Sequence, residues 1–193
     1  MSEAKKGFLP LSHGIRLSET QSPSTSDERS RMSRIPYASA IRSIMYAMIC
    51  TRLDVAFEIS LTSRYQANPG ESHWAAVKTI LKYLKRTKEM FLVYGGEEGL
   101  VVKGYADASF QTDIDDCRSQ SGFVYVMNGG AVSWMSSKQD TVADSTIEAK
   151  YIAAHEAAKE AIWLRKFIGE LGVVPSIKGP IAQIGRASCR ERV

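Results

Sequence analysis

Two acidic residues lie where carboxylates can do chemistry, one at the end of a predicted strand and one at the start of a predicted helix. Asp107 closes the alternating apolar run of residues 101–106, and Glu148 opens a long helical pattern. A strand-end carboxylate that faces a carboxylate on a following helix can hold a divalent cation, and Mg²⁺ prefers such hard oxygen ligands. We therefore predict a metal site in which the two carboxylates lie about 4–6 Å apart.

Each of these residues also has an ordinary structural explanation. Asp107 could be a turn residue at the end of its strand. Glu148 completes the string Ser145-Thr146-Ile147-Glu148, which is typical of a capping box, where the glutamate accepts from a backbone amide at the helix start. On the local pattern alone, the structural explanation is favoured for both residues.

Other polar residues give weaker signals. Asp113, Asp115 and Asp116 form an acidic loop, but it lacks the glycine and terminal glutamate of an EF-hand, so a solvated hairpin loop is favoured. His73 and His155 are isolated and are expected at the surface or half-buried. Four basic residues could touch a phosphate backbone or simply form a solvated helix face: Lys78, Lys82, Lys85 and Arg86.

The first half of the chain predicts a flexible leader followed by helices. Residues 1–35 are rich in serine and basic residues, which is typical of an unpacked segment. A helix is expected from about Pro36, because proline suits a first helical turn. A second helix is expected over about 53–66, and a third with Ser72 as its N-cap.

The second half predicts an antiparallel sheet and one long helix. Strands are expected at 100–106, 121–127 and 131–136, and Asn128-Gly129-Gly130 between the last two is a strong hairpin signal. A helix over about 145–171 should end at Gly172 and Pro175. Trp134 and Trp163 are expected in the core. The buried stripe of the helix is expected to consist of Ile147, Tyr151, Ala154, Ala158, Ile162 and Phe167.

Composition favours an ordinary globular protein. The chain has 193 residues, a net charge of +4 and three cysteines without metal or disulfide spacing. The N-terminus lacks an apolar signal core, and no apolar stretch approaches the length of a membrane span, so we expect an intracellular protein that is not secreted and has no membrane partner. The last ten residues, 184–193, resemble a translated sequencing adapter and are excluded from the assignment of domains and function. Residues 181–184, partly within this tail, are nevertheless expected to pair in parallel with the strand at 100–106 as a short substitute strand.

Two stretches resemble the Pol polyprotein of copia-type LTR retrotransposons. Residues 36–87, which begin PYASAIRSIMY, are similar to the helical end of the reverse transcriptase. Residues 104–172, which begin GYADASF and include ADSTIEAKYIAAHEAAKE, are similar to the first part of its ribonuclease H domain. Composition and the resemblance together divide the chain into four parts. The resemblance gives the reverse-transcriptase end (36–88) and the start of a ribonuclease H-like domain (89–183), and composition gives the leader (1–35) and the adapter-like tail (184–193). The implied fold class is α+β or α/β, with three antiparallel strands and a long helix in an incomplete ribonuclease H-like fold.

The resemblance also implies a function. Asp107 and Glu148 match the first two catalytic acids of ribonuclease H, which would hold Mg²⁺ and hydrolyse the RNA strand of an RNA–DNA hybrid; no small-molecule cofactor is implied. The chain has no Tyr-x-Asp-Asp polymerase motif and no aspartate after Asp144, so we expect a catalytically incomplete copy. A non-catalytic nucleic-acid-binding protein or a functionless remnant is the alternative.

Overall fold

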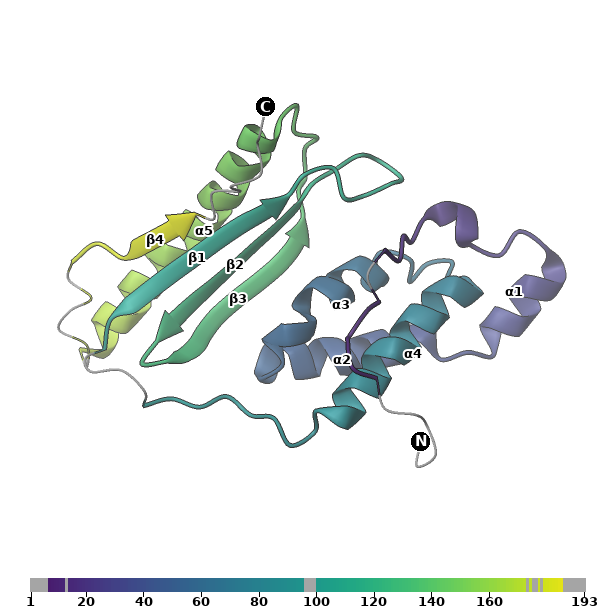
Figure 1. The fold of residues 1–193 in the computed structure, drawn as a ribbon, viewed down its shortest axis with the longest axis horizontal. Coiled ribbons are helices and arrows are strands. Elements are labelled where there is room, and N and C mark those ends of the chain that lie inside the picture. The colour runs from purple at the N-terminus through teal and green to yellow at the C-terminus, as the bar shows by residue number, and fades with distance from the viewer. Residues whose placement is uncertain are drawn as a thin grey trace. The chain divides into compact units, whose positions relative to one another are not determined.

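The computed structural model describes residues 7–12, 14–95, 100–172, 174, 177 and 179–185, and the chain forms two compact units. Unit 1 comprises residues 1–91 and unit 2 comprises residues 92–193, so the division falls a few residues after the predicted boundary. Within the described residues, unit 1 contains only helices, whereas unit 2 combines a four-stranded sheet with one long helix (Figure 1). The expectation of a mixed α and β class is therefore confirmed.

Unit 1 is built on large aliphatic and aromatic side chains. Its elements are η1 (Glu19–Gln21), α1 (Ser26–Ser33), α2 (Tyr37–Cys50), η2 (Leu53–Val55), α3 (Ala56–Ser63) and α4 (Glu71–Arg86). Their buried core consists of Tyr37, Ile41, Ile44, Val55, Ile59, Val77 and Ile80. The predicted start at Pro36 is confirmed, because Pro36 is the N-cap of α2. The predicted cap Ser72 is wrong: Gly70 is the N-cap of α4 and its N–H donates to Nδ1 of His73 at 2.9 Å.

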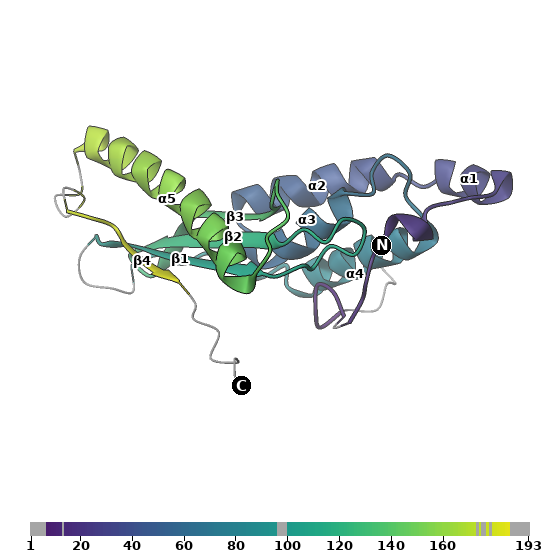
Figure 2. The ribbon, with the colours of Figure 1, turned by 90° about the horizontal axis from the view of Figure 1, so that it is seen from above.

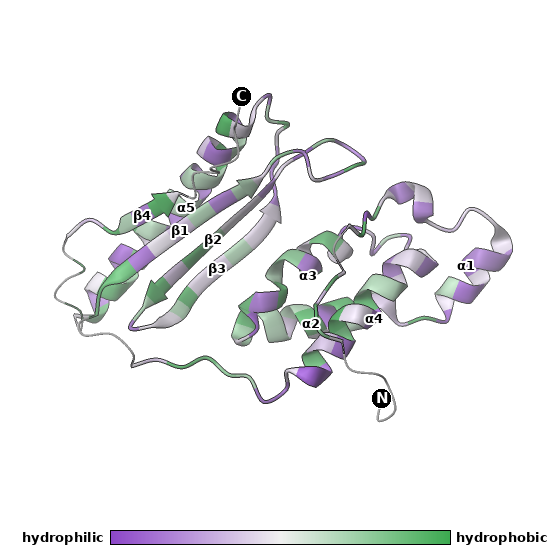
Figure 3. Cartoon of the chain, viewed as in Figure 1, coloured by the Kyte–Doolittle hydropathy of each residue, from purple (hydrophilic) through white to green (hydrophobic). Residues whose placement is uncertain are grey.

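The expectation of an unpacked leader is wrong for residues 14–35. Thr25 and Glu28 form a capping box at the start of α1, although α1 is mostly hydrophilic while α2 and α3 are mostly hydrophobic (Figure 3). Leu17 and Met32 are buried, and the Leu17 carbonyl accepts a hydrogen bond from the Tyr65 hydroxyl at 2.8 Å. A few buried apolar side chains and backbone hydrogen bonds hold this polar segment in place. Amino-acid composition does not reveal such contacts, because they involve only a few residues.

Unit 2 contains the predicted antiparallel strands. They are β1 (Val102–Ser109), β2 (Gln120–Met127) and β3 (Gly130–Lys138), and the sheet order is β3-β2-β1-β4. The predicted hairpin is confirmed, since Asn128 and Gly129 both have positive φ and connect the paired residues Met127 and Gly130. This two-residue turn matches the right-handed twist of the strands it joins.

The long helix α5 (Thr146–Leu171) covers one face of this sheet (Figure 2). Its N-cap is Ser145, and Gly172 ends it with φ of 68°, a left-handed conformation that suits glycine. Pro175, the other expected stop, lies outside the described residues.

The predicted buried stripe of α5 is wrong. Tyr151 is 75% exposed, and Ile147, Ile162 and Phe167 are also exposed. The buried residues are Ala149, Ala153, Ala157, Leu164 and Ile168. Alanines spaced four apart let the helix approach the sheet closely, whereas the sequence pattern was dominated by the larger apolar side chains. Trp163 is likewise 54% exposed instead of lying in the core.

A short fourth strand completes the sheet. Strand β4 (Ala182–Gly185) pairs in parallel with Lys103–Ala106 of β1. The expected short parallel strand beside residues 100–106 is therefore confirmed, and Ile184 and Gly185 of the adapter-like tail take part in it. Residues 186–193 lie outside the described residues. Within the described part of the chain, no helix is both long enough and apolar enough to cross a membrane.

Candidate functional site

Asp107 lies near the end of β1, which together with β2 forms the central pair of strands in the sheet. Its side chain is exposed, and its Oδ1 accepts from the backbone N–H of Ala108 at 2.9 Å. Because side chains alternate along a strand, Asp107 shares a face with Lys103 and Tyr105. The other face carries Val102, which packs in the cluster that includes residues of α5. Asp107 therefore points to the side of the sheet away from the helix.

Glu148 lies in the first turn of α5 and is also exposed. Its backbone N–H donates to Ser145 Oγ at 3.1 Å, and its Oε2 accepts from the Asp144 backbone N–H at 2.7 Å. This is the capping role that the local sequence favours, with the return bond going to Asp144 instead of Ser145. The second carboxylate oxygen of Glu148, Oε1, takes no part in this cap.

The two carboxylates belong to the same end of unit 2. Strand β1 ends where α5 begins (Figures 1 and 2). Strand β4 pairs with β1 only as far as Ala106, so Asp107 lies one residue beyond the covered part of that edge. Asp107 points away from the face that α5 covers, whereas Glu148 lies on α5, and this placement counts against a shared site. A cation held by both carboxylates would have to lie beyond this strand end, where the two side chains could reach around the edge of the sheet. The predicted separation of 4–6 Å stays a prediction. Among the described residues, no three histidine, cysteine or acidic side chains converge as a complete set of metal ligands.

Gln139 connects α5, which carries Glu148, to β2, the strand that pairs with the Asp107 strand, and no sequence pattern singled it out. It is fully buried, and its Nε2 donates to the Ala149 carbonyl at 2.8 Å and to Ser121 Oγ at 2.9 Å. Ala149 follows Glu148, while Ser121 pairs in register with Ala108, the neighbour of Asp107. A glutamine directly after a strand gives no sequence signal of burial, because it reads as a surface residue.

The acidic loop is held by a lysine. Lys138 Nζ lies 3.1 Å from Asp113 Oδ2 and 2.8 Å from Asp116 Oδ2, and Asp113 is only 3% exposed. Burial alone would lower the pKa of Lys138, but the hydrogen bonds and charges of Asp116 and Asp113 outweigh burial and raise it. The expectation of a simply solvated loop is therefore wrong for Asp113, which anchors the loop to the end of β3.

The isolated histidines have different environments. His155 is exposed, as expected. His73 is fully buried, contrary to expectation, and stacks on Tyr65 with ring centroids 4.0 Å apart. Its Nε2 lies 3.1 Å from the Ser18 carbonyl, which only accepts, so this nitrogen carries the proton. His73 thus has a structural role that connects α4 to residues before α1.

The basic residues of α4 lie on its less buried sides. Lys78 and Arg86 are exposed, and the Arg86 guanidinium lies 3.7 Å from the ring centroid of Phe8. Glu71 is the only acidic residue of this helix. The helix therefore presents positive charge, which suits both solvent and a phosphate backbone.

The chain is similar to several transposon proteins. It is 46% identical over 173 residues to the retrovirus-related Pol polyprotein from transposon TNT 1-94 of Nicotiana tabacum, a match that covers 90% of this chain and 13% of that protein. It is 31% identical over 152 residues to the putative transposon Ty5-1 protein YCL074W of Saccharomyces cerevisiae, covering 78% of this chain and 47% of that protein.

A third relative has a different description. The secreted RxLR effector protein 161 of Plasmopara viticola is 41% identical over 133 residues, which cover 69% of this chain and 94% of that protein. The chain matches no protein-family model and no solved structure.

Proposed function

The chain belongs to the retrovirus-related Pol polyproteins of copia-type transposons, and we propose that unit 2 is the part of such a polyprotein that contributes to hydrolysis of RNA in RNA–DNA hybrids. The chain spans about an eighth of the length of the tobacco relative. Assigning to this chain any activity of the whole polyprotein is therefore a proposal. One observation carries it: an aspartate at the end of the inner strand β1 and a glutamate in the first turn of α5 lie at one end of the same unit.

The donor chemistry fits Mg²⁺. Both residues are exposed carboxylates. In each, one oxygen accepts a backbone hydrogen bond, and the other oxygen takes no part in that bond. Mg²⁺ keeps most of its water shell and commonly binds one or two carboxylates together with substrate phosphates. Asp107 and Glu148 would hold the ion, and bound Mg²⁺ would polarise the phosphate and activate water.

The surrounding residues would fix these two ligands. The amide of Ala108 orients the Asp107 carboxylate, and the amide of Asp144 orients that of Glu148. Gln139 holds the first turn of α5 against the start of β2 through Ala149 and Ser121. A carboxylate fixed in this way loses less conformational entropy when it binds a cation.

In the proposal, the basic side of α4 binds the nucleic-acid backbone. Four lysine and arginine residues in one 16-residue helix support this, because phosphate contacts are chiefly made by such side chains. The same feature favours the alternative function, a nucleic-acid-binding protein without catalysis. Salt dependence of hybrid binding, compared between the native chain and a Lys78→Gln, Arg86→Gln variant, tests this part.

The proposal is tested by metal binding and by cleavage. Mn²⁺ titration monitored by the water-proton relaxation rate should show saturable binding that Asp107→Asn and Glu148→Gln each weaken at least tenfold. Glu170→Gln, which makes the same charge change in exposed α5 sequence, should leave it unchanged. Equal binding by all four proteins would refute the site.

We expect no cleavage of an RNA–DNA hybrid by the 193-residue chain alone. Two carboxylates can hold one ion, whereas hydrolysis by two metal ions requires further ligands. Cleavage that disappears in Asp107→Asn would show instead that this pair of acids suffices.

A further inference from the structure

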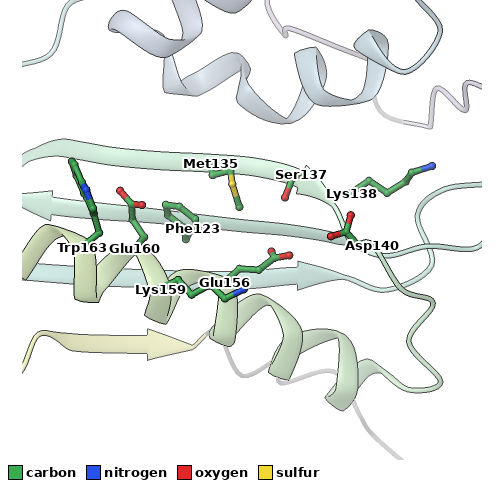
Figure 4. A pocket seen from close by; sticks show the side chains of 9 residues that line it. All are labelled: Phe123, Met135, Ser137, Lys138, Asp140, Glu156, Lys159, Glu160 and Trp163. Carbon is green, nitrogen blue, oxygen red and sulfur yellow. The ribbon is translucent and has the colours of Figure 1, made fainter.

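The structure has a second feature that the proposed metal site does not use, a pocket between α5 and the edge strand β3. It has a volume of about 550 Å³ (Figure 4). Its lining residues are Phe123, Met135, Ser137, Lys138, Asp140, Glu156, Lys159, Glu160 and Trp163. We propose that this pocket binds an arginine side chain of an extended peptide that lies along β3.

The pocket combines an apolar floor with acidic walls. Phe123 and Met135 are register partners on β2 and β3 and form the floor. Asp140, Glu156 and Glu160 supply three carboxylates. The pocket also has two lysines. Lys138 is already paired with Asp113 and Asp116, and in Figure 4 its side chain points away from the pocket. Lys159 balances one of the three carboxylates, so the remaining charge is negative and the pocket is complementary to a cation with an apolar stem.

One carboxylate oxygen lacks a donor. Oε2 of Glu156 is buried without a hydrogen-bond partner in the described structure, so a rotation that turns it toward the pocket would let it gain a hydrogen bond. Glu160, one turn further along α5, already accepts from Ser133 Oγ at 2.7 Å. Like charges four residues apart on a helix repel each other, and a cation between them relieves this repulsion. A buried carboxylate oxygen gains most from a charged donor.

Trp163 makes arginine the better match than lysine. It is half-exposed beside the pocket, and Phe167 stacks on it with parallel rings whose centroids are 5.1 Å apart. This stacking fixes the orientation of the indole. A planar guanidinium can stack on an indole face while its N–H groups reach a carboxylate, which an ammonium group cannot do equally well.

The backbone of the partner has a place beside the pocket. Strand β3 is the outer strand of the sheet and, among the described residues, pairs with no strand other than β2. The Tyr94 hydroxyl donates to the Ala131 carbonyl, so the edge open to a peptide lies beyond Ala131. An extended peptide can add to such an edge through backbone hydrogen bonds, while a side chain pointing toward α5 enters the pocket. A nucleic acid is disfavoured here, because the carboxylates repel phosphates.

The experiment uses the full chain and a fluorescent probe peptide, acetyl-Thr-Val-Thr-Arg-Thr-Val-Thr-amide, measured by fluorescence anisotropy. Saturable binding is expected, weakened at least fivefold when citrulline replaces arginine and severalfold when lysine replaces it. Glu156→Gln and Trp163→Ala should each weaken it at least fivefold, and Glu170→Gln less than twofold.

Several results would overturn the proposal. Binding that is absent, or equal for the citrulline peptide, excludes an arginine site. An unchanged affinity in Glu156→Gln places the contact elsewhere. Stronger binding of single-stranded DNA than of peptide, lost in Trp163→Ala, would identify the indole as a base-stacking surface instead. Because none of these readouts involves a metal ion, they are independent of the outcome at Asp107 and Glu148.

Discussion

The two units differ in the side chains through which their helices make contact. The helices of unit 1 meet through large side chains such as Ile41, Val55 and Ile59, which are almost inaccessible to solvent, although Tyr46 and Ile49 remain exposed. In unit 2, α5 turns small alanines to the sheet and leaves Tyr151 and Ile162 exposed. Burial of apolar surface is the main stabilising contribution in folding, so unit 1 should tolerate isolation in water better than unit 2. Unit 2 has apolar surface available for contacts with other chain segments.

The largest expected effect is in the core of unit 1. Ile59→Ala removes three carbon atoms from a fully buried site and should lower the free energy of unfolding of this unit by about 3–4 kcal/mol. Hydrogen exchange followed by mass spectrometry on the full chain should show the loss in peptides of α2, α3 and α4. An equal loss of protection in β1 and β2 would show that the units unfold together and break the comparison.

The next effect tests the close packing in unit 2. A Cβ placed on Gly104 would lie 2.3 Å from Cε1 of Tyr125, whose hydroxyl donates to the Ala157 carbonyl at 2.6 Å. Gly104→Val should therefore displace Tyr125 and destabilise unit 2 by about 2–3 kcal/mol. The same exchange experiment should report the change in β1, β2 and α5. Gly169→Ala is the control, because a Cβ there meets no atom within 4 Å apart from the backbone of its own helix.

Sequence patterns predict these elements better than they predict which side chains are buried. The turn at Asn128-Gly129 and the ends of α5 at Ser145 and Gly172 follow from local backbone chemistry, and the structure has all of them. The buried face of α5 does not follow, because exposed residues such as Ile147 give a stronger apolar signal than the alanines that contact the sheet.

In the candidate site, too, some residues could be found from the sequence and others only from the fold. The positions of Asp107 and Glu148 in a strand and a helix make them candidates, but only the resemblance to the ribonuclease H domain favours metal ligands over a turn residue and a helix cap. Gln139 could not, because its burial depends on three segments that meet only in the folded chain. The lysine that neutralises Asp113 is equally non-local, since Lys138 follows it by 25 positions.

A third prediction separates positioning of the metal ligands from stability. Gln139→Leu removes two hydrogen bonds and should cost about 1–2 kcal/mol, whereas Tyr125→Phe removes one helix–sheet hydrogen bond and should cost about 1 kcal/mol. Only Gln139→Leu should weaken Mn²⁺ binding, because its bonds lie beside Asp107 and Glu148. The relaxation titration described above measures this. Weakening by both variants would mean that loss of stability alone reduces the affinity.

The smallest expected effect concerns an acidic residue in unit 1. Burial raises the pKa of Glu58, and its Oε2 has no hydrogen-bond partner in the described structure. Since the folded-state pKa lies above the unfolded value, the folded chain binds this proton more tightly. Stability from this group is present below the unfolded pKa and is lost as pH rises through the raised folded pKa.

Glu58→Gln should therefore stabilise unit 1 slightly at neutral pH, by a fraction of a kcal/mol, and flatten the decline in stability as pH rises from about 4 to 7. Urea denaturation followed by far-UV circular dichroism at several pH values measures both effects. Glu71→Gln, at an exposed position in the first turn of α4, is the matched control and should not stabilise the unit, because its carboxylate pairs with Arg31. A neutral-pH loss of stability in Glu58→Gln would show that the charged carboxylate contributes favourably, and that the helical unit accommodates a buried charge as well as large apolar side chains.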